Sequence, residues 1–187
     1  METKKILNGI DTVRMVQTVE AIKKQPELAR FEFRAKNRWD TGGTNHSKID
    51  GFYGAGREDD SRKKPFLFTN GEPPVLLGNN EGANPVEFLL HAAAGCLTTT
   101  FILQASARGI SISEMSTELD GDIDLRGLLD LDASVPPGYK EIRIKMNVKA
   151  DCSDREIEDL IDYAKKHSPV LNTISRPVQV TVKRAAP

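Results

Sequence analysis

The segment NPVEFLLHAAAGCLTTT, residues 84–100, decides how this chain folds. Asn84 is a strong helix N-cap and Pro85 suits the first helical position, so the segment predicts a helix that starts here. Apolar and small residues continue over 88–103, which predicts a helix buried on most of its faces. Cys96 lies about three turns into this helix and is therefore held on a rigid element.

The residues before this helix predict one further helix, two strands and a long loop. Asp11 precedes apolar residues spaced about three apart, which stop before Pro26 and predict an N-terminal helix within residues 1–27. Apolar and polar residues alternate over 28–36 and predict a strand. Gly42-Gly43 predicts a turn from this strand into a second strand at 46–52. Glycine, proline and a charge run predict a loop over 54–80.

The residues after the cysteine helix predict strands followed by one more helix. Alternation predicts strands over 116–124, 140–149 and 177–183. Ser153 with Glu156 forms a capping box that opens a helix ending before Pro169. We therefore expect an α+β fold with largely antiparallel sheets, in a single domain whose segments are 1–27, 28–80, 84–109 and 110–187.

The composition predicts an ordinary globular protein. The chain has 187 residues, of which 39% are hydrophobic and 28% charged, with a net charge of −1. This balance argues against a nucleic-acid partner. Because we find no signal peptide and expect no membrane span, the predicted location is cytoplasmic. Cys96 and Cys152 are the two cysteines and neither has metal-ligand spacing around it, so no metal and no cofactor are expected.

The cysteine helix and its surroundings resemble the OsmC/Ohr family. The resemblance rests on Asn84-Pro85 and the small residues before Cys96, and it extends over about residues 28–184. Three further segments match the family. Arg108-Gly109-Ile110 closes the cysteine helix, and Pro137-Gly138-Tyr139 leads into the later strand. The last helix ends in His167-Ser168-Pro169.

The resemblance implies a fold, an assembly and an activity. The fold is OsmC-like, with two sheets wrapped around central helices in an intertwined homodimer. The activity is reduction of hydroperoxides, in which Cys96 attacks the peroxide and an external thiol restores it. Apolar walls would favour organic hydroperoxides, and the candidate binding residues are Phe88, Leu89, Leu97 and Phe101.

Three positions depart from the family pattern. Thr44 follows the Gly-Gly turn where peroxide-reducing members carry an arginine, and Val86 follows Asn-Pro where they carry the active glutamate. Glu87, one residue later, is the remaining candidate acid, although nine residues of regular helix place it roughly opposite Cys96. Ser168 stands where many members have a resolving cysteine, and a hydroxyl cannot form that disulfide.

Other residues are candidates for the missing roles. Cys152 lies just before a helix N-terminus and is a candidate resolver, with an unremarkable loop cysteine as the alternative. Arg38 and His46 flank the Gly-Gly turn and are candidate cations, with simple solvation as the alternative.

Two functions follow from these residues. One is a thiol-dependent peroxidase that uses Cys96 and belongs to the oxidative stress response, with peroxiredoxin-like activity. The other is a non-catalytic homodimer that binds a small apolar ligand or a partner on the same fold. The helix face around Cys96 carries no charge to stabilise a thiolate, which favours the second, and the family resemblance favours the first.

Overall fold

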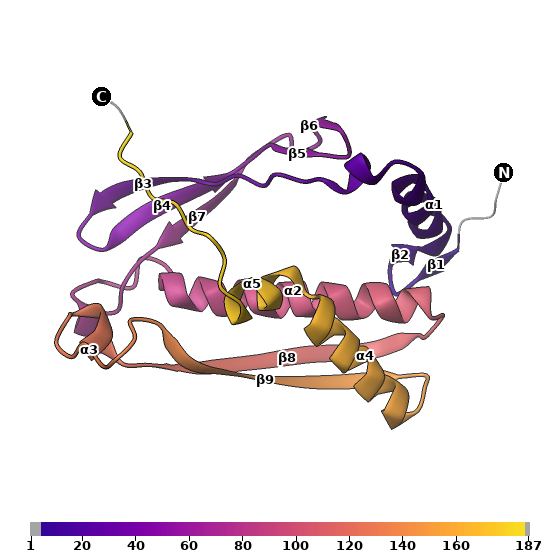
Figure 1. Cartoon of the computed structure of the whole chain (residues 1–187). Helices are drawn as coiled ribbons and strands as arrows, with labels where there is room; N and C mark the ends of the chain where they lie inside the picture. The colour runs from indigo at the N-terminus through magenta and orange to yellow at the C-terminus, as the bar shows by residue number, and fades with distance from the viewer. Residues whose placement is uncertain (1–4, 186–187) are drawn as a thin grey trace. The chain divides into compact units, whose positions relative to one another are not determined.

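The protein was analysed as a computed structural model that describes residues 5–185, and its chain packs into two compact units. Among residues 5–185, the first unit comprises 5–6 and Asp11–Leu89, and the second comprises Leu7–Ile10 and 90–185. The long helix α2 (Pro85–Ala107) begins in the first unit and continues into the second (Figure 1). Strands pair antiparallel throughout the named sheets, which confirms the predicted α+β class.

The N-terminal helix α1 (Thr12–Lys24) forms where the sequence predicts it. Asp11 is its N-cap, and its Oδ1 accepts a hydrogen bond of 3.0 Å from the Arg14 N–H. Two short strands precede it, β1 (Ile6–Leu7) and β2 (Ile10–Asp11), and a 3-10 turn, η1 (Pro26–Ala29), follows it. No residue of α1 is buried in the described chain.

A three-stranded sheet in the first unit has the order β3-β4-β7. The strands are β3 (Lys36–Thr41), β4 (Thr44–Ile49) and β7 (Phe66–Asn70). Gly42 at the β3–β4 turn has a φ of +53°, a conformation that favours glycine, so the predicted Gly-Gly turn is confirmed.

The predicted strand at residues 28–36 is wrong for most of its length. Leu28 and Ala29 lie in η1 and Lys36 begins β3, and between them only Glu32 pairs, through two backbone hydrogen bonds with Tyr53. Phe31 and Phe33 instead stack against each other and against Phe52, with ring centroids 5.4 to 6.2 Å apart. Aromatic stacking along one face therefore produces the alternation that predicted a paired strand.

The predicted loop at 54–80 is also wrong in part, because it contains regular structure. A hairpin of β5 (Phe52–Gly54) and β6 (Arg57–Asp59) turns at Ala55 and Gly56, which both have positive φ. Two positive φ values are the signature of a tight hairpin turn, but alanine does not signal one in sequence. The strand β7 and a 3-10 turn, η2 (Pro74–Leu76), complete this region.

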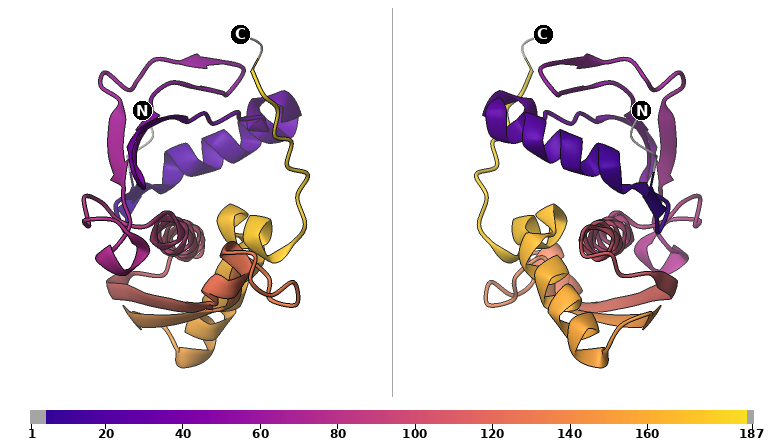
Figure 2. Two further views of the ribbon diagram at one scale, coloured as in Figure 1. Left: turned by 90° about the vertical axis from the view of Figure 1, so that its left-hand side faces the viewer. Right: turned by 90° about the vertical axis from the view of Figure 1, so that its right-hand side faces the viewer.

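A long antiparallel hairpin dominates the second unit. It consists of β8 (Ile112–Ile123) and β9 (Tyr139–Ala150), joined through a short helix α3 (Leu125–Leu128). The helix α4 (Asp154–His167) opens with the predicted capping box, in which Ser153 and Glu156 bond reciprocally. A last helix, α5 (Pro169–Ser175), follows directly. Figure 2 shows α2 end on, with α4 and α5 beside it.

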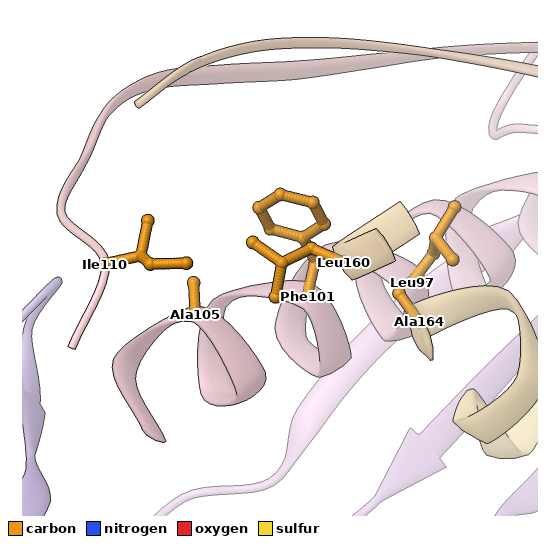
Figure 3. Close-up of a cluster of buried hydrophobic side chains, with 6 residues drawn as sticks. All are labelled: Leu97, Phe101, Ala105, Ile110, Leu160 and Ala164. Carbon is orange, nitrogen blue, oxygen red and sulfur yellow. The ribbon is translucent and has the colours of Figure 1, made fainter. Parts of the chain in front are cut away.

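The core of the second unit lies between α2, α4 and the hairpin. Its buried members are Leu97, Phe101, Ala105, Ile110, Leu160 and Ala164 (Figure 3). The inward residues of both strands pack against this cluster, including Ile144 and Met146. The buried face of α2 therefore packs against the inward-facing residues of β8 and β9 and against the apolar side of α4.

The predicted C-terminal strand at 177–183 does not form in the described chain. Residues 177–185 have no regular structure, although Val178, Val180 and Val182 alternate as a strand requires. A strand needs a neighbouring strand to satisfy its backbone, and this segment pairs with none of the described strands.

The helix α2 is long and apolar enough, by length and composition, to cross a membrane, which corrects the expectation that no stretch could. The core helix of a globular protein passes the same test. Five residues of α2 are buried within the described chain, and Leu97 and Phe101 among them belong to the core of the second unit.

Candidate active site

Cys96 lies at the boundary between the buried and the exposed faces of α2. Its neighbours Ala93 and Leu97 are buried, whereas Ala92 and Thr99 on the adjoining face are exposed. Cys96 itself is half-buried, and its thiol is free. A thiol in this position is partly exposed on a helix whose Leu97 and Phe101 pack into the core.

The start of α2 is fixed by reciprocal hydrogen bonds between Asn84 and Glu87. The Asn84 Oδ1 accepts a bond of 2.9 Å from the Val86 N–H, and a Glu87 carboxylate oxygen accepts one of 2.8 Å from the Asn84 N–H. Together they form a capping arrangement. The structure thus gives Glu87 a defined helix-capping role. Because α2 is continuous over the nine residues to Cys96, that carboxylate is about 13 Å away along the axis.

Glu72 links the Gly-Gly turn to the helix start within the first unit. Asn84 donates a side-chain hydrogen bond to the Glu72 carboxylate. A side chain at Gly43 would bring its Cβ to 2.9 Å from the Glu72 Cγ, so Glu72 also packs under the turn. The sequence gives no local signal for Glu72, because this residue lies in the predicted loop, twelve residues before its partner Asn84.

Thr44 occupies the position where the family pattern has arginine. Its side chain is buried in the first unit. The Asn79 side chain, with help from Thr44, holds the pKa of Glu81 below its usual range. Asn79 therefore is the main local partner of Glu81.

The two candidate cations of the first unit, Arg38 and His46, face each other across the β3–β4 register. The His46 Nδ1 lies 3.2 Å from the Thr69 Oγ1, and its Nε2 lies 3.6 Å from the Asp40 carboxylate. His46 is thus engaged within its own sheet, and Arg38 is exposed beside it.

Cys152, the candidate resolver, packs against the core of the second unit. Burial raises the pKa of its thiol, and the carboxylates of Glu156, Asp151 and Asp154 raise it further. Burial and the acidic side chains beside this helix N-terminus therefore work against a thiolate at Cys152.

Ser168 is completely buried at the junction of α4 and α5. Its N–H donates to the Ala164 carbonyl at 2.8 Å, which ends α4, and its Oγ accepts from the Leu171 N–H, which begins α5. The hydroxyl at the family's cysteine position thus serves as a cap between two helices.

The candidate apolar binding residues divide between two settings. Leu97 and Phe101 belong to the core of the second unit, packed with Leu160. Phe88 makes an edge-to-face contact with Phe68 in the first unit, with centroids 6.0 Å apart, and Leu89 is half-buried. Residues 5–185 contain no group of three His, Cys, Asp or Glu side chains that could hold a metal.

Taken together, the fold and the site define an α+β protein with a free cysteine on a long core helix that begins at an Asn-Pro cap. Residues 78–183 match the family model described as OsmC-like protein, and the chain belongs to this family. A search of curated proteins gives no match.

Solved structures of OsmC-like proteins share the fold. An OsmC-like protein from Mycoplasma pneumoniae is 19% identical, with a TM-score of 0.60 over 77% of this chain and 87% of that one. An organic hydroperoxide resistance protein OsmC from Legionella pneumophila is 18% identical, with a TM-score of 0.54 over 76% and 88%. An organic hydroperoxide resistance protein from Elizabethkingia anophelis is 20% identical, with a TM-score of 0.53 over 75% and 85%.

Proposed function

We propose that this chain reduces organic hydroperoxides through Cys96 in the cytoplasm, with an external thiol as the resolver. The observation that carries the proposal is the free, half-buried Cys96 at the edge of the apolar face of α2. A hydroperoxide with an apolar group can pack on such a face while its oxygen approaches the sulfur. Two of the structural relatives are named organic hydroperoxide resistance proteins, which supports this substrate class.

The proposed reaction balances with two equivalents of thiol. The Cys96 thiolate attacks the outer oxygen of ROOH, the O–O bond breaks, and the alkoxide that leaves takes a proton from solvent, so the products are a cysteine sulfenic acid and ROH. A first external thiol condenses with the sulfenic acid and releases water. A second thiol attacks the mixed disulfide, which frees Cys96 and leaves an external disulfide.

An external resolver is proposed because neither internal position suits the role. The Cys152 thiol has a raised pKa and packs against the core, so it is a poor attacking nucleophile. Ser168 carries a hydroxyl and is buried as a helix cap. For Glu87 we propose that its contribution is to cap the cysteine helix.

We further propose that the protein acts as a homodimer. Only 17% of the most apolar stretch of α2 is buried within the described chain. Apolar helix surface left in water costs about 25 cal/mol per Å², so a second copy that covers it would be stabilising.

Thiol-driven turnover tests the activity. Purified protein with cumene hydroperoxide and a small dithiol should consume the peroxide, and a sulfenic-acid trap should add to Cys96. Cys152→Ser is the matched control and should keep the full rate, because Cys152 has no part in the cycle. Loss of turnover in Cys152→Ser would reject the external resolver, and trapping that is equal in Cys96→Ser would reject Cys96 as the reactive thiol.

The second candidate function is a homodimer that binds a small apolar ligand or a partner without catalysis. The observation that favours it is the engagement of the Glu87 carboxylate in the helix cap. This alternative predicts no turnover and saturable binding of an apolar fluorescent probe that Cys96→Ser leaves unchanged.

A further inference from the structure

The turn between β1 and β2 consists of Asn8 and Gly9. Their φ values are +51° and +79°, and two positive φ values are typical of a tight hairpin turn, for which Asn-Gly is a favoured sequence. The segment Leu7–Ile10 belongs to the second unit, where the turn lies against the carboxyl end of α2 (Figure 1). Asn8 is half-buried there and Gly9 is exposed.

The Asn8 side chain holds this turn in place with both ends of its amide. Its Nδ2 donates hydrogen bonds to the Ser106 Oγ at 3.1 Å and to the Ile110 carbonyl at 2.9 Å. Its Oδ1 accepts a hydrogen bond of 2.8 Å from the Ile112 N–H. We call these three contacts the Asn8 clasp.

The same two residues can react with each other. In an Asn-Gly sequence the glycine has no Cβ that would hinder attack by its own nitrogen. The Gly9 nitrogen attacks the Asn8 Cγ, the Nδ2 leaves as ammonia with the proton of that nitrogen, and a succinimide ring forms. Water then opens the ring at either carbonyl and leaves aspartate or isoaspartate. The reaction thus consumes one water molecule and needs no oxidant, reductant or cofactor.

The clasp opposes this reaction in the folded protein. Ammonia cannot leave while the Asn8 Nδ2 donates both of its hydrogen bonds to Ser106 and Ile110. The clasp must therefore open first, so the rate of deamidation follows the population of the open turn.

The product cannot form the clasp again. A carboxylate has no N–H to donate, so an oxygen would face the Ile110 carbonyl oxygen at the place where Nδ2 now donates. Isoaspartate also lengthens the backbone by one methylene, which changes the geometry of the turn. We propose that Asn8 is a site of spontaneous deamidation, and that this modification permanently releases the β1–β2 turn from the end of α2.

A second Asn-Gly pair, Asn70 and Gly71, provides a comparison within the same molecule. Both residues are buried in the first unit. The Asn70 Nδ2 donates to the Asn45 Oδ1 at 2.8 Å, and the Gly71 N–H, which would be the nucleophile, donates to the Ala83 carbonyl at 3.2 Å. Since this pair is buried and its nucleophile is engaged, the folded protein should react at Asn8 in preference to Asn70.

The first test follows both asparagines in the full chain at pH 8. Peptide mapping by mass spectrometry separates the asparagine, aspartate and isoaspartate forms of each site. In guanidinium chloride, Asn8 and Asn70 should react at rates within about threefold of each other, because only the shared Asn-Gly sequence is left. In the folded protein, Asn8 should react at least about tenfold more slowly than in guanidinium chloride and at least about tenfold faster than Asn70.

Two results of this test would overturn the inference. An Asn8 rate that is equal in folded and unfolded protein would show that the clasp does not control the reaction. An Asn8 rate no higher than the Asn70 rate in the folded protein would show that Asn8 is not the preferred site.

The second test weakens the clasp at one contact. Ser106→Ala removes an acceptor of the Asn8 amide and should raise the Asn8 rate at least about threefold. Ser113→Ala is the matched control, because it removes an exposed hydrogen bond to the Lys149 carbonyl, and it should leave the rate within about 1.5-fold. The Asn70 rate should stay constant in both variants. Equal rises at Asn8 and Asn70 would mean that global unfolding controls the reaction, which would contradict a local clasp.

The third test measures what the modification does to the turn. Asn8→Asp reproduces one product, and hydrogen exchange reports on the Ile112 N–H that the Asn8 side chain now accepts. This amide should exchange at least about tenfold faster in Asn8→Asp, while amides in the middle of the β8–β9 hairpin keep their protection. Unchanged exchange at Ile112 would overturn the release of the turn. None of these measurements involves Cys96, so their outcome is independent of the proposed peroxidase function.

Discussion

Phe101 gives the sharpest test of how the cysteine helix is used. The sequence suggests it as a wall of a substrate cleft, whereas the structure packs its ring against the core with 0% exposure. Removing a fully buried phenylalanine side chain costs about 3–5 kcal/mol. Leu160 and Ala164 of α4 belong to the same cluster and limit the collapse of the cavity that Phe101→Ala would leave (Figure 3). We therefore expect the loss of stability in Phe101→Ala to fall at the upper end of this range.

Phe101→Leu is the informative variant because it keeps most of the volume. It should lower the free energy of unfolding by about 1–1.5 kcal/mol, measured by urea denaturation with an unchanged m-value. The ratio of Cys96 oxidation rates by cumene hydroperoxide and by hydrogen peroxide should stay constant. Leu103→Ala, on a side chain that is 40% exposed, is the matched control and should cost less than about 1 kcal/mol. A changed ratio without a loss of stability would refute the core assignment.

Three further outcomes follow from the contacts. Glu87→Gln retains an acceptor for the Asn84 N–H, so it should leave the rate of Cys96 oxidation within about twofold. Glu87→Ala removes that acceptor and should lower the free energy of unfolding by about 1 kcal/mol, measured by thermal unfolding. A large loss of rate in Glu87→Gln would show a catalytic carboxylate. In Cys96→Ser protein, the raised pKa of Cys152 means that the folded state holds its proton more tightly than the unfolded state. Alkylation by iodoacetamide at pH 8 should therefore be slower than for free cysteine, and stability should fall as the pH rises through the thiol range; fast alkylation would contradict this. Asn8 has a φ of +51°, and its side chain forms hydrogen bonds with Ser106, Ile110 and Ile112. Asn8→Ala removes these bonds, so urea denaturation should show a loss of about 2–4 kcal/mol in the free energy of unfolding. A loss below about 1 kcal/mol would argue against a stabilising role of these bonds.

Helix boundaries were predictable because their signals are local. Asp11, Asn84 and Ser153 each cap the helix expected from the sequence, and each bonds to a backbone N–H two or three residues on. Propensity and capping act within one turn, so a single sequence contains the information. The strands β8 and β9 were equally clear, since their alternation matches one buried face.

Strand partners were less predictable because pairing is a long-range property. The alternation at 28–36 arises from stacked phenylalanines, and the alternation at 177–183 finds no strand among the described residues. Conversely, β7 lies in a region rich in turn residues, yet it pairs with β4 over five residues. Each case depends on what lies opposite, which periodicity does not report.

The helix that carries Cys96 was predictable from the sequence, and the contacts around the start of that helix were less so. The motif identifies the cysteine helix, but the contacts of Glu72 with Asn84 and Gly43 join segments that are distant in sequence. The environment of Cys152 depends on burial and on three carboxylates together, so its position before a helix was a misleading guide to its reactivity.

The most direct test of the central claim is the rate at which Cys96 reacts with peroxide. Stopped-flow oxidation of the Cys152→Ser protein by cumene hydroperoxide at pH 7, with Cys96→Ser as the blank, measures that single step. The account predicts a rate at least about a hundredfold above that of free cysteine under the same conditions. A rate equal to that of free cysteine would contradict the peroxidase function and leave a binding dimer on the same fold.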